Sequence, residues 1–139
     1  MIRYYRLLLS LICFIGIPLS QNTYPIILIH GFLGWGRDEM AGYYYWGGKT
    51  DIESELKSSG YEVYTVSVGP ISPNWDRAIE AFYQIKGGQV DYGNDKAEKQ
   101  GIIQRPPGKK YPGFYPQWDE NHPVHLIGHS QGGSTAKML

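Results

Sequence analysis

The chain has 139 residues, enough for one domain at most, and its 13 basic and 13 acidic residues give a formal net charge of zero. This balance excludes the strong electrostatic attraction on which binding to nucleic acid or to an acidic partner depends. Twelve tyrosines, four tryptophans and 18 glycines indicate a folded, turn-rich protein and argue against a disordered chain.

The N-terminal residues have the composition of a secretory signal peptide. Arg3 and Arg6 precede an almost purely apolar run, Leu7–Ile17, after which the chain turns polar. This run is too short to cross a bilayer comfortably, which takes about twenty apolar residues. An uncleaved anchor or a buried strand is the alternative interpretation.

We therefore predict two parts, a signal peptide at residues 1–20 and a secreted domain at residues 21–139. The single cysteine, Cys13, lies in the signal peptide. The domain thus reaches an oxidising compartment without a disulfide of its own, so packing or a metal must stabilise it.

Three segments have the pattern of strands in a mostly parallel sheet. They are rich in apolar or β-branched residues and end at or next to a glycine: Tyr24–Gly31, Tyr61–Val68 and Val124–Gly128. The first is a continuous apolar run, typical of a strand that is buried on both faces. A predicted helix separates the first two strands, and this order predicts that they pair in parallel.

Three helices are predicted between and after these strands. Thr50–Ser59 begins with a capping box, in which Thr50 is the N-cap and Glu53 reaches back to it. The second helix spans Ser72–Lys86, with the serine as its N-cap and a proline at its first turn. The third spans Gly132–Leu139. Helical spacing predicts that the buried face of the second helix consists of Trp75, Ile79, Phe82 and Ile85.

Two longer segments have no clear period. Arg37–Lys49 is rich in tyrosine and tryptophan. We interpret it as an aromatic loop packed on the surface, with part of an apolar substrate approach as the alternative. Gln89–Glu120 is too long for a structureless loop inside a compact domain, so we expect an ordered insertion rather than a flexible loop.

The strongest functional signal is the G-x-S-x-G motif at Gly128–Gly132, between the third strand and the third helix. Its small first and last residues permit a strained turn that lifts the Ser130 hydroxyl above the sheet. The turn also places this serine at a helix N-terminus, where negative charge is favoured. We predict that Ser130 is a nucleophile, and an ordinary tight turn is the alternative.

A serine that attacks a carbonyl carbon needs two hydrogen-bond donors for the developing oxyanion. One is the backbone N–H of the residue after the nucleophile, Gln131. The other comes from the loop after an earlier strand, and residues 30–32 form the only candidate loop. Gly31 allows the backbone to approach closely there, and we assign the N–H of Phe32 as the second donor.

The base and its acid partner are not evident in the sequence. In this fold class an Asp or Glu and then a His follow the serine, and the nine residues after Ser130 contain neither. We therefore expect structural roles for the four histidines. His30 would brace the loop that carries Phe32, and His129 would point away from the site. The other two are His122 and His125.

Together these segments resemble a known family. The blocks that carry the resemblance follow one another in order at residues 25–37, 45–48, 51–53, 68–70, 72–78, 87–93, 111–113 and 127–133. They are similar to the staphylococcal and thermophilic Bacillus-type secreted triacylglycerol lipases, which have the α/β-hydrolase fold. The resemblance covers nearly everything after the signal peptide. It implies that the chain is the N-terminal part of that fold, truncated after the serine turn.

The resemblance implies hydrolysis of lipid esters at an oil–water interface, under a mobile helical lid. It implies Ser130 as the nucleophile, with the backbone of Phe32 and Gln131 as oxyanion donors. The catalytic Asp and His of the family, and its calcium site, belong to sequence beyond Leu139. This chain alone is therefore expected to be inactive.

The family also carries a structural zinc ion, and Asp76 matches one of its ligands. Two histidines of the family fall where this chain has Lys96 and Ile102. Neither side chain can bind zinc as imidazole does, and the fourth ligand would lie beyond Leu139. The alternative for Asp76 is a solvated acid in the first turn of a helix, where it favours the helix dipole.

The sequence thus predicts part of a secreted serine lipase or esterase whose partner is a lipid ester, with no nucleic acid and no stable membrane span. A phospholipase or an acyltransferase on the same scaffold is one alternative. A non-catalytic lipid-surface binder or truncated fragment is the other.

Overall fold

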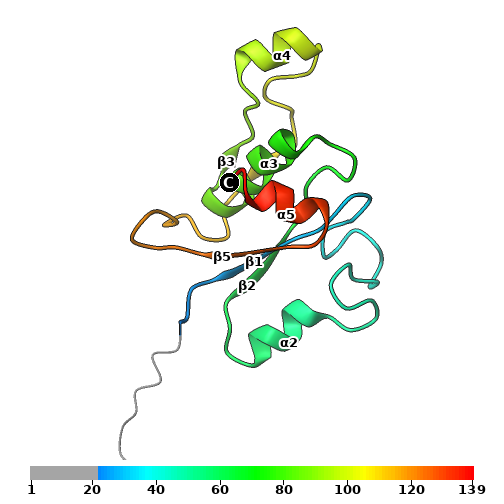
Figure 1. Cartoon of the computed structure of the whole chain (residues 1–139), viewed down its shortest axis with the longest axis vertical. Coiled ribbons are helices and arrows are strands. Elements are labelled where there is room, and N and C mark those ends of the chain that lie inside the picture. Colours follow the sequence, from blue (N-terminus) through cyan, green and yellow to red (C-terminus); the bar gives the residue numbers. More distant parts are fainter. Residues whose placement is uncertain (1–21) are drawn as a thin grey trace, which may run out of the picture.

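The computed structural model describes residues 22–139, so the predicted signal peptide and Cys13 lie outside the described residues. A three-stranded parallel sheet forms the centre, with β1 (Ile26–Ile29) between β2 (Val63–Val66) and β5 (His125–Gly128) (Figure 1). The predicted parallel pairing is confirmed. Within residues 22–139, no helix is long and apolar enough to span a membrane.

Helices cover both faces of this sheet. The helices α3 (Asn74–Lys86) and α5 (Gln131–Ala136) lie on one face, and α2 (Ile52–Ser58) lies on the other beside β2 (Figure 1). The core forms where α3 meets the strands, because the apolar side chains of both elements exclude water there. Its fully or almost fully buried members are Ile27, Ile29, Val66, Val68, Ala81 and Ile85.

The strands differ in burial. The central strand β1 is buried on both faces, as its continuous apolar run predicts, with Ile27 and Ile29 at 0% exposure on one face and Leu28 at 3% on the other. The edge strand β5 is not buried, and Ile127 is 45% exposed. Within residues 22–139, α5 packs against β5 on one face of the sheet. On the other face the helix α2 packs against β2.

The predicted helix starts are wrong by one or two residues. Helix α2 begins at Ile52, and Asp51 rather than Thr50 caps it by accepting a hydrogen bond from the Ser54 N–H at 3.1 Å. The Asp51 carboxylate is fixed in the N-cap position because the Arg37 guanidinium, in the preceding loop, donates hydrogen bonds to it. Helix α3 begins at Asn74, with the proline at residue 73 rather than the serine at residue 72 in the N-cap position.

The predicted buried face of α3 is also wrong in part. Ile85 is buried, but Trp75 is 56% exposed and Phe82 is 41% exposed. The helix instead turns polar side chains inward, where loops at the ends of the strands and the segment after α3 supply their polar partners. These buried polar residues are Asp76, Arg77, Glu80 and Gln84.

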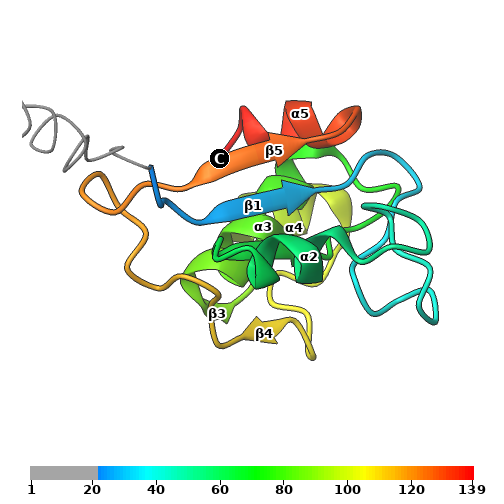
Figure 2. The same ribbon diagram turned by 90° about the horizontal axis from the view of Figure 1, so that it is seen from below.

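The segment after α3 is organised, which confirms the expected insertion. It contains the antiparallel pair β3 (Gly88–Gln89) and β4 (Lys110–Tyr111), with α4 (Asn94–Gln100) between them. We call residues 88–111 the α4 lobe; it projects away from the sheet (Figure 1), and β3 and β4 lie apart from the three main strands (Figure 2). The sequence did not predict helix α4, because Ala97 is its only buried residue and the helix therefore has no apolar periodicity.

Candidate active site

The turn at Ser130 has the strained geometry that the motif predicts. Ser130 lies between the end of β5 and the start of α5, with φ 55° and ψ −121°. A positive φ is uncommon for a residue other than glycine and persists only where the surrounding structure enforces it. Helix α5 begins at the next residue, Gln131, so Ser130 lies at the N-terminus of this helix.

Glycines on both sides of the serine make this turn possible. A Cβ atom on Gly128 would lie 2.3 Å from the carbonyl carbon of Gly132. A Cβ atom on Gly132 would lie 2.1 Å from the carbonyl oxygen of Ile29. Both neighbours are backbone atoms that cannot rotate away. The start of α5 therefore packs directly on the end of β1, which only glycine permits.

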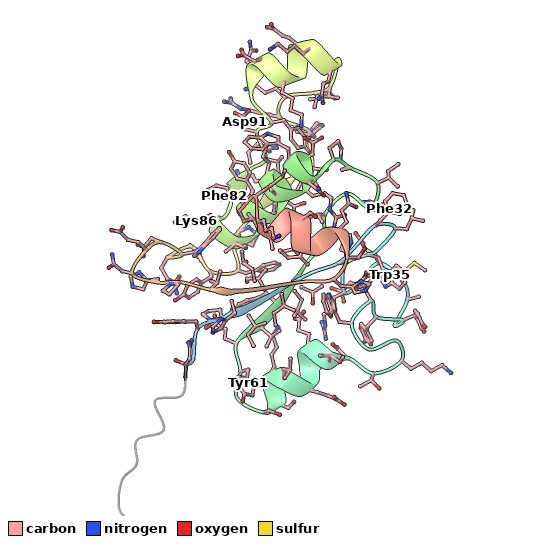
Figure 3. The ribbon with its side chains drawn as sticks, in the orientation of Figure 1. Phe32, Trp35, Tyr61, Phe82, Lys86 and Asp91 are labelled. Carbon is pink, nitrogen blue, oxygen red and sulfur yellow. The ribbon has the colours of Figure 1, made fainter. Side chains whose placement is uncertain are left out.

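The loop after β1 meets the serine turn at the carboxyl ends of the strands. A Cβ atom on Gly31 would lie 2.9 Å from the Cβ of Ser130. The His129 N–H donates to the carbonyl of Ile29 at 3.1 Å. The structure thus brings together the two segments that carry the predicted oxyanion donors. The Phe32 side chain is 60% exposed at this end of the sheet (Figure 3).

His30 braces this loop, as predicted. Its ring is fully buried; Nδ1 lies 2.9 Å from the carbonyl oxygen of Gly31, and Nε2 lies 3.3 Å from the N–H of Val68. Because the Val68 N–H can only donate, Nε2 accepts and the proton is on Nδ1. Burial lowers the pKa of His30, and the positive charge of Arg77 lowers it further. The ring is therefore neutral and structural.

Arg77 is the residue that sequence reasoning missed. Its guanidinium is fully buried and donates to the carbonyl of His30, to the carbonyl of Gly69 at 2.7 Å and to the hydroxyl of Thr135 at 3.1 Å. These partners belong to the loop after β1, the loop after β2 and α5. One side chain thus connects three segments around the serine turn. Its sequence signal is weak, because a charged residue in a helix usually faces solvent.

The aromatic loop also reaches the site. The Gly31 N–H donates to the Tyr45 hydroxyl at 3.0 Å, and the same hydroxyl contacts Nδ1 of His129. The Tyr45 ring packs edge-on against Trp35. The His129 ring therefore faces the aromatic loop, and the Tyr45 hydroxyl connects it to the loop after β1.

A depression of about 390 Å³ lies beside this contact. It is lined by Trp35, Tyr43, Tyr44, Tyr45, Trp46, Gly47, Gly48 and His129. The predicted surface loop is thus exposed in part and packed against the serine turn in part.

Each histidine of the chain has a partner other than the serine. His122 pairs with Asp119 at 2.8 Å, before β5 begins, and the ring of His125 packs against that of Tyr24. His30 and His129 have the contacts described above. The expectation of structural roles for these rings agrees with the geometry.

The side chains around Asp76 do not fit a zinc ion. The carboxylate of Asp76 pairs through Oδ1 with the Lys96 ammonium, which cannot bind a metal. Ile102, at the second position, is 37% exposed and has no donor atom. Within residues 22–139, no group of three or more His, Cys, Asp or Glu side chains could hold a metal ion.

A parallel sheet with helices on both faces and a serine turn at the carboxyl end of a strand places the chain among the α/β domains. The family model described as "Lipase-like, C-terminal domain" matches residues 22–139. The chain belongs to this lipase-like family, which confirms the resemblance drawn from the sequence motifs.

Known relatives agree with this assignment. The chain is 45% identical over 121 residues to lipase 2 of Staphylococcus aureus and 44% identical over 122 residues to a lipase of Staphylococcus epidermidis. These matches cover 85% and 86% of this chain but only 17% of either relative. The chain thus spans about a sixth of the length of these curated relatives.

Solved structures give the same result. EstA from Clostridium botulinum matches 85% of this chain with a TM-score of 0.79 and 51% identity. Staphylococcus hyicus lipase matches 86% of it with a TM-score of 0.78 and 42% identity. This chain covers 27% and 31% of those two structures.

Proposed function

We propose that this chain is part of a secreted carboxylic ester hydrolase that acts on lipids, with the α/β-hydrolase fold and Ser130 as its nucleophile. The observation that carries this proposal is the positive φ of Ser130 in a turn packed on the end of β1. Names of the relatives support the substrate class, since two of them are lipases.

The reaction proceeds through an acyl-enzyme. The Ser130 oxygen attacks the ester carbonyl carbon and loses its proton to a base, and the alcohol leaves after that base returns the proton to it. The backbone N–H groups of Phe32 and Gln131 stabilise the negative charge on the carbonyl oxygen. Water then releases the carboxylic acid. The base and its acid partner would be the His and Asp that the resemblance places beyond Leu139, where it also places a calcium site.

The surroundings of Ser130 suit an apolar substrate. Phe32 and Leu33 are 60% and 61% exposed in the loop that meets the serine turn, and the aromatic depression reaches His129, the residue before Ser130. Large exposed apolar side chains that gather at one place mark a binding surface. We therefore favour a substrate approach over a purely structural role for the aromatic loop.

The test is Ser130→Ala in the full-length protein. We expect the substitution to abolish covalent labelling by a serine-directed phosphonate and to abolish ester hydrolysis, with an unchanged circular dichroism spectrum. The substrates are a triglyceride, a short-chain ester and a phospholipid, with a second alcohol as acyl acceptor, so that lipase, phospholipase and acyltransferase activities are separated. Labelling that survived in the variant would remove Ser130 as the nucleophile.

A further inference from the structure

The α4 lobe has a fully buried apolar side chain at its start, Val90, but its helix α4 has almost no buried apolar surface of its own. Within α4 only Ala97 is buried, and the lobe projects from the rest of the molecule (Figure 1). An element without a buried apolar face needs another source of stability, because helix propensity alone is marginal at this length.

Polar contacts with α3 supply it: two ion pairs, and a hydrogen bond that the Tyr92 hydroxyl donates to Glu80. The Lys96 ammonium pairs with the Asp76 carboxylate, and their side chains are 17% and 13% exposed. The Lys109 ammonium lies 2.6 Å from Oε1 of Glu80, whose side chain is 3% exposed. In both pairs α3 supplies the acid and the lobe supplies the lysine.

Asp76 depends on its partner because its carboxylate is buried. A buried charge without a counter-charge is strongly unfavourable, so removal of one partner destabilises the protein more than the pair stabilises it. The neighbouring cation Arg77 is directed elsewhere, toward His30, Gly69 and Thr135. Lys96 is therefore the cation that balances Asp76.

We propose that the Lys96 ammonium has replaced a metal ion as the tether between α3 and the α4 lobe. The resemblance places a zinc ligand at Asp76 and imidazoles at the positions of Lys96 and Ile102. In this chain Lys96 places a positively charged side chain at the first of those positions. Ile102, at the second, has no atom that could bind a metal. The internal ion pair neutralises the carboxylate and spans the same two elements, so the domain needs no zinc to hold the lobe.

This proposal does not depend on the catalytic role of Ser130, and its test needs no activity. The first experiment measures the metal content of the full-length protein by mass spectrometry, and its thermal unfolding with EDTA and with added zinc. To keep any calcium site filled, calcium is added back to the EDTA sample in excess. We expect no stoichiometric zinc and the same midpoint in all samples. One bound zinc per chain, or a midpoint lowered by EDTA and restored by zinc, would overturn the proposal.

The second experiment compares Lys96→Met with Lys99→Met, an identical substitution at an exposed position of the same helix. We expect Lys96→Met to lower the midpoint by about 5 °C and Lys99→Met to leave it within about 1 °C. Addition of Asp76→Asn to Lys96→Met should recover part of the loss, because it removes the unpaired charge.

Hydrogen exchange resolves where the loss occurs, even if Lys96→Met is only marginally folded. Amides of residues 94–101 should exchange faster in Lys96→Met while those of β1 keep their protection, since the tether acts on the lobe. Equal midpoints for the Lys96 and Lys99 variants, or unchanged exchange in the lobe, would refute the tether.

Discussion

The serine turn and the α4 lobe both depend on the polar face of α3, but they are built differently. At the serine turn, the buried guanidinium of Arg77 works beside an apolar core and close glycine contacts. At the lobe, the carboxylates of Asp76 and Glu80 pair with the ammonium groups of Lys96 and Lys109. One helix thus serves two regions with side chains of opposite charge, the cation Arg77 for one and the acids Asp76 and Glu80 for the other.

The difference explains where strain can be stored. The backbone of Ser130 keeps a positive φ because several contacts fix it from independent directions, including the packing of Gly132 on Ile29. Between the lobe and α3, two ion pairs made by flexible lysine side chains fix the backbone less tightly than direct backbone packing does. The proposed nucleophile Ser130 therefore lies in the region that can keep its geometry fixed.

The largest effect is expected from Gly132→Ala. The new Cβ would lie 2.1 Å from the carbonyl oxygen of Ile29, so the backbone of α5 or β1 must move. Chemical denaturation should show a loss of about 3 kcal/mol or more in the free energy of unfolding. Gly133→Ala is the matched control, because its Cβ would meet only the Gly128 oxygen at 3.7 Å. Equal losses for the two variants would show that the turn is not limited by this contact.

Arg77→Met should come next. It leaves the carbonyls of His30 and Gly69 and the Thr135 hydroxyl without a buried donor, and we expect a loss of about 3 kcal/mol. Ester hydrolysis should lose kcat more than KM, because the loop that carries the proposed donor Phe32 loosens. Arg105→Met removes a guanidinium that is 66% exposed and should cost below about 1 kcal/mol. A full retention of kcat in Arg77→Met would contradict a positioning role.

Acidification should weaken the serine turn through His30. Burial holds the pKa of His30 below its ordinary value of 6.5, so the unfolded chain binds the extra proton first. The stability that depends on the neutral ring is present above about pH 6.5 and falls as the pH drops toward the folded-state pKa, by at most about 1.4 kcal/mol per pH unit. Unfolding in urea at pH 7.5 and at pH 5.5 measures this slope.

The control for this slope uses two glutamine variants. His30→Gln should flatten the pH dependence, and His125→Gln, at an exposed position of β5, should leave it as in the wild type. If all three proteins lost the same stability between the two pH values, His30 would not be the group responsible.

The smallest effect is expected at the lobe from Lys109→Met. Glu80 would lose one partner but keep the Tyr92 hydroxyl and the Gly69 N–H, and the Lys109 side chain is already 37% exposed. We expect a loss of about 1 kcal/mol, measured by denaturation beside the exposed control Lys110→Met. A loss as large as that of Arg77→Met would mean that the two regions are equally dependent on α3.

The sequence by itself determined the features that depend on neighbouring residues. The apolar run of β1 predicted a buried parallel strand, and the glycines around Ser130 predicted a strained turn, because backbone freedom and strand burial leave local patterns. The motif blocks identified the family because each block is a short run of neighbouring residues that can be compared directly. Spacing also placed the loops after β1 and β5 at one end of a parallel sheet.

Only the tertiary structure decided which side chains face inward and which partners they find. The apolar spacing of Trp75 and Phe82 predicted their burial, yet the structure buries Arg77 and Asp76, whose partners lie far away in the sequence. Helix α4 has no apolar period to reveal it. Burial of a polar group is decided by the hydrogen bonds and counter-charges that the fold assembles around it, and these are absent from any local pattern.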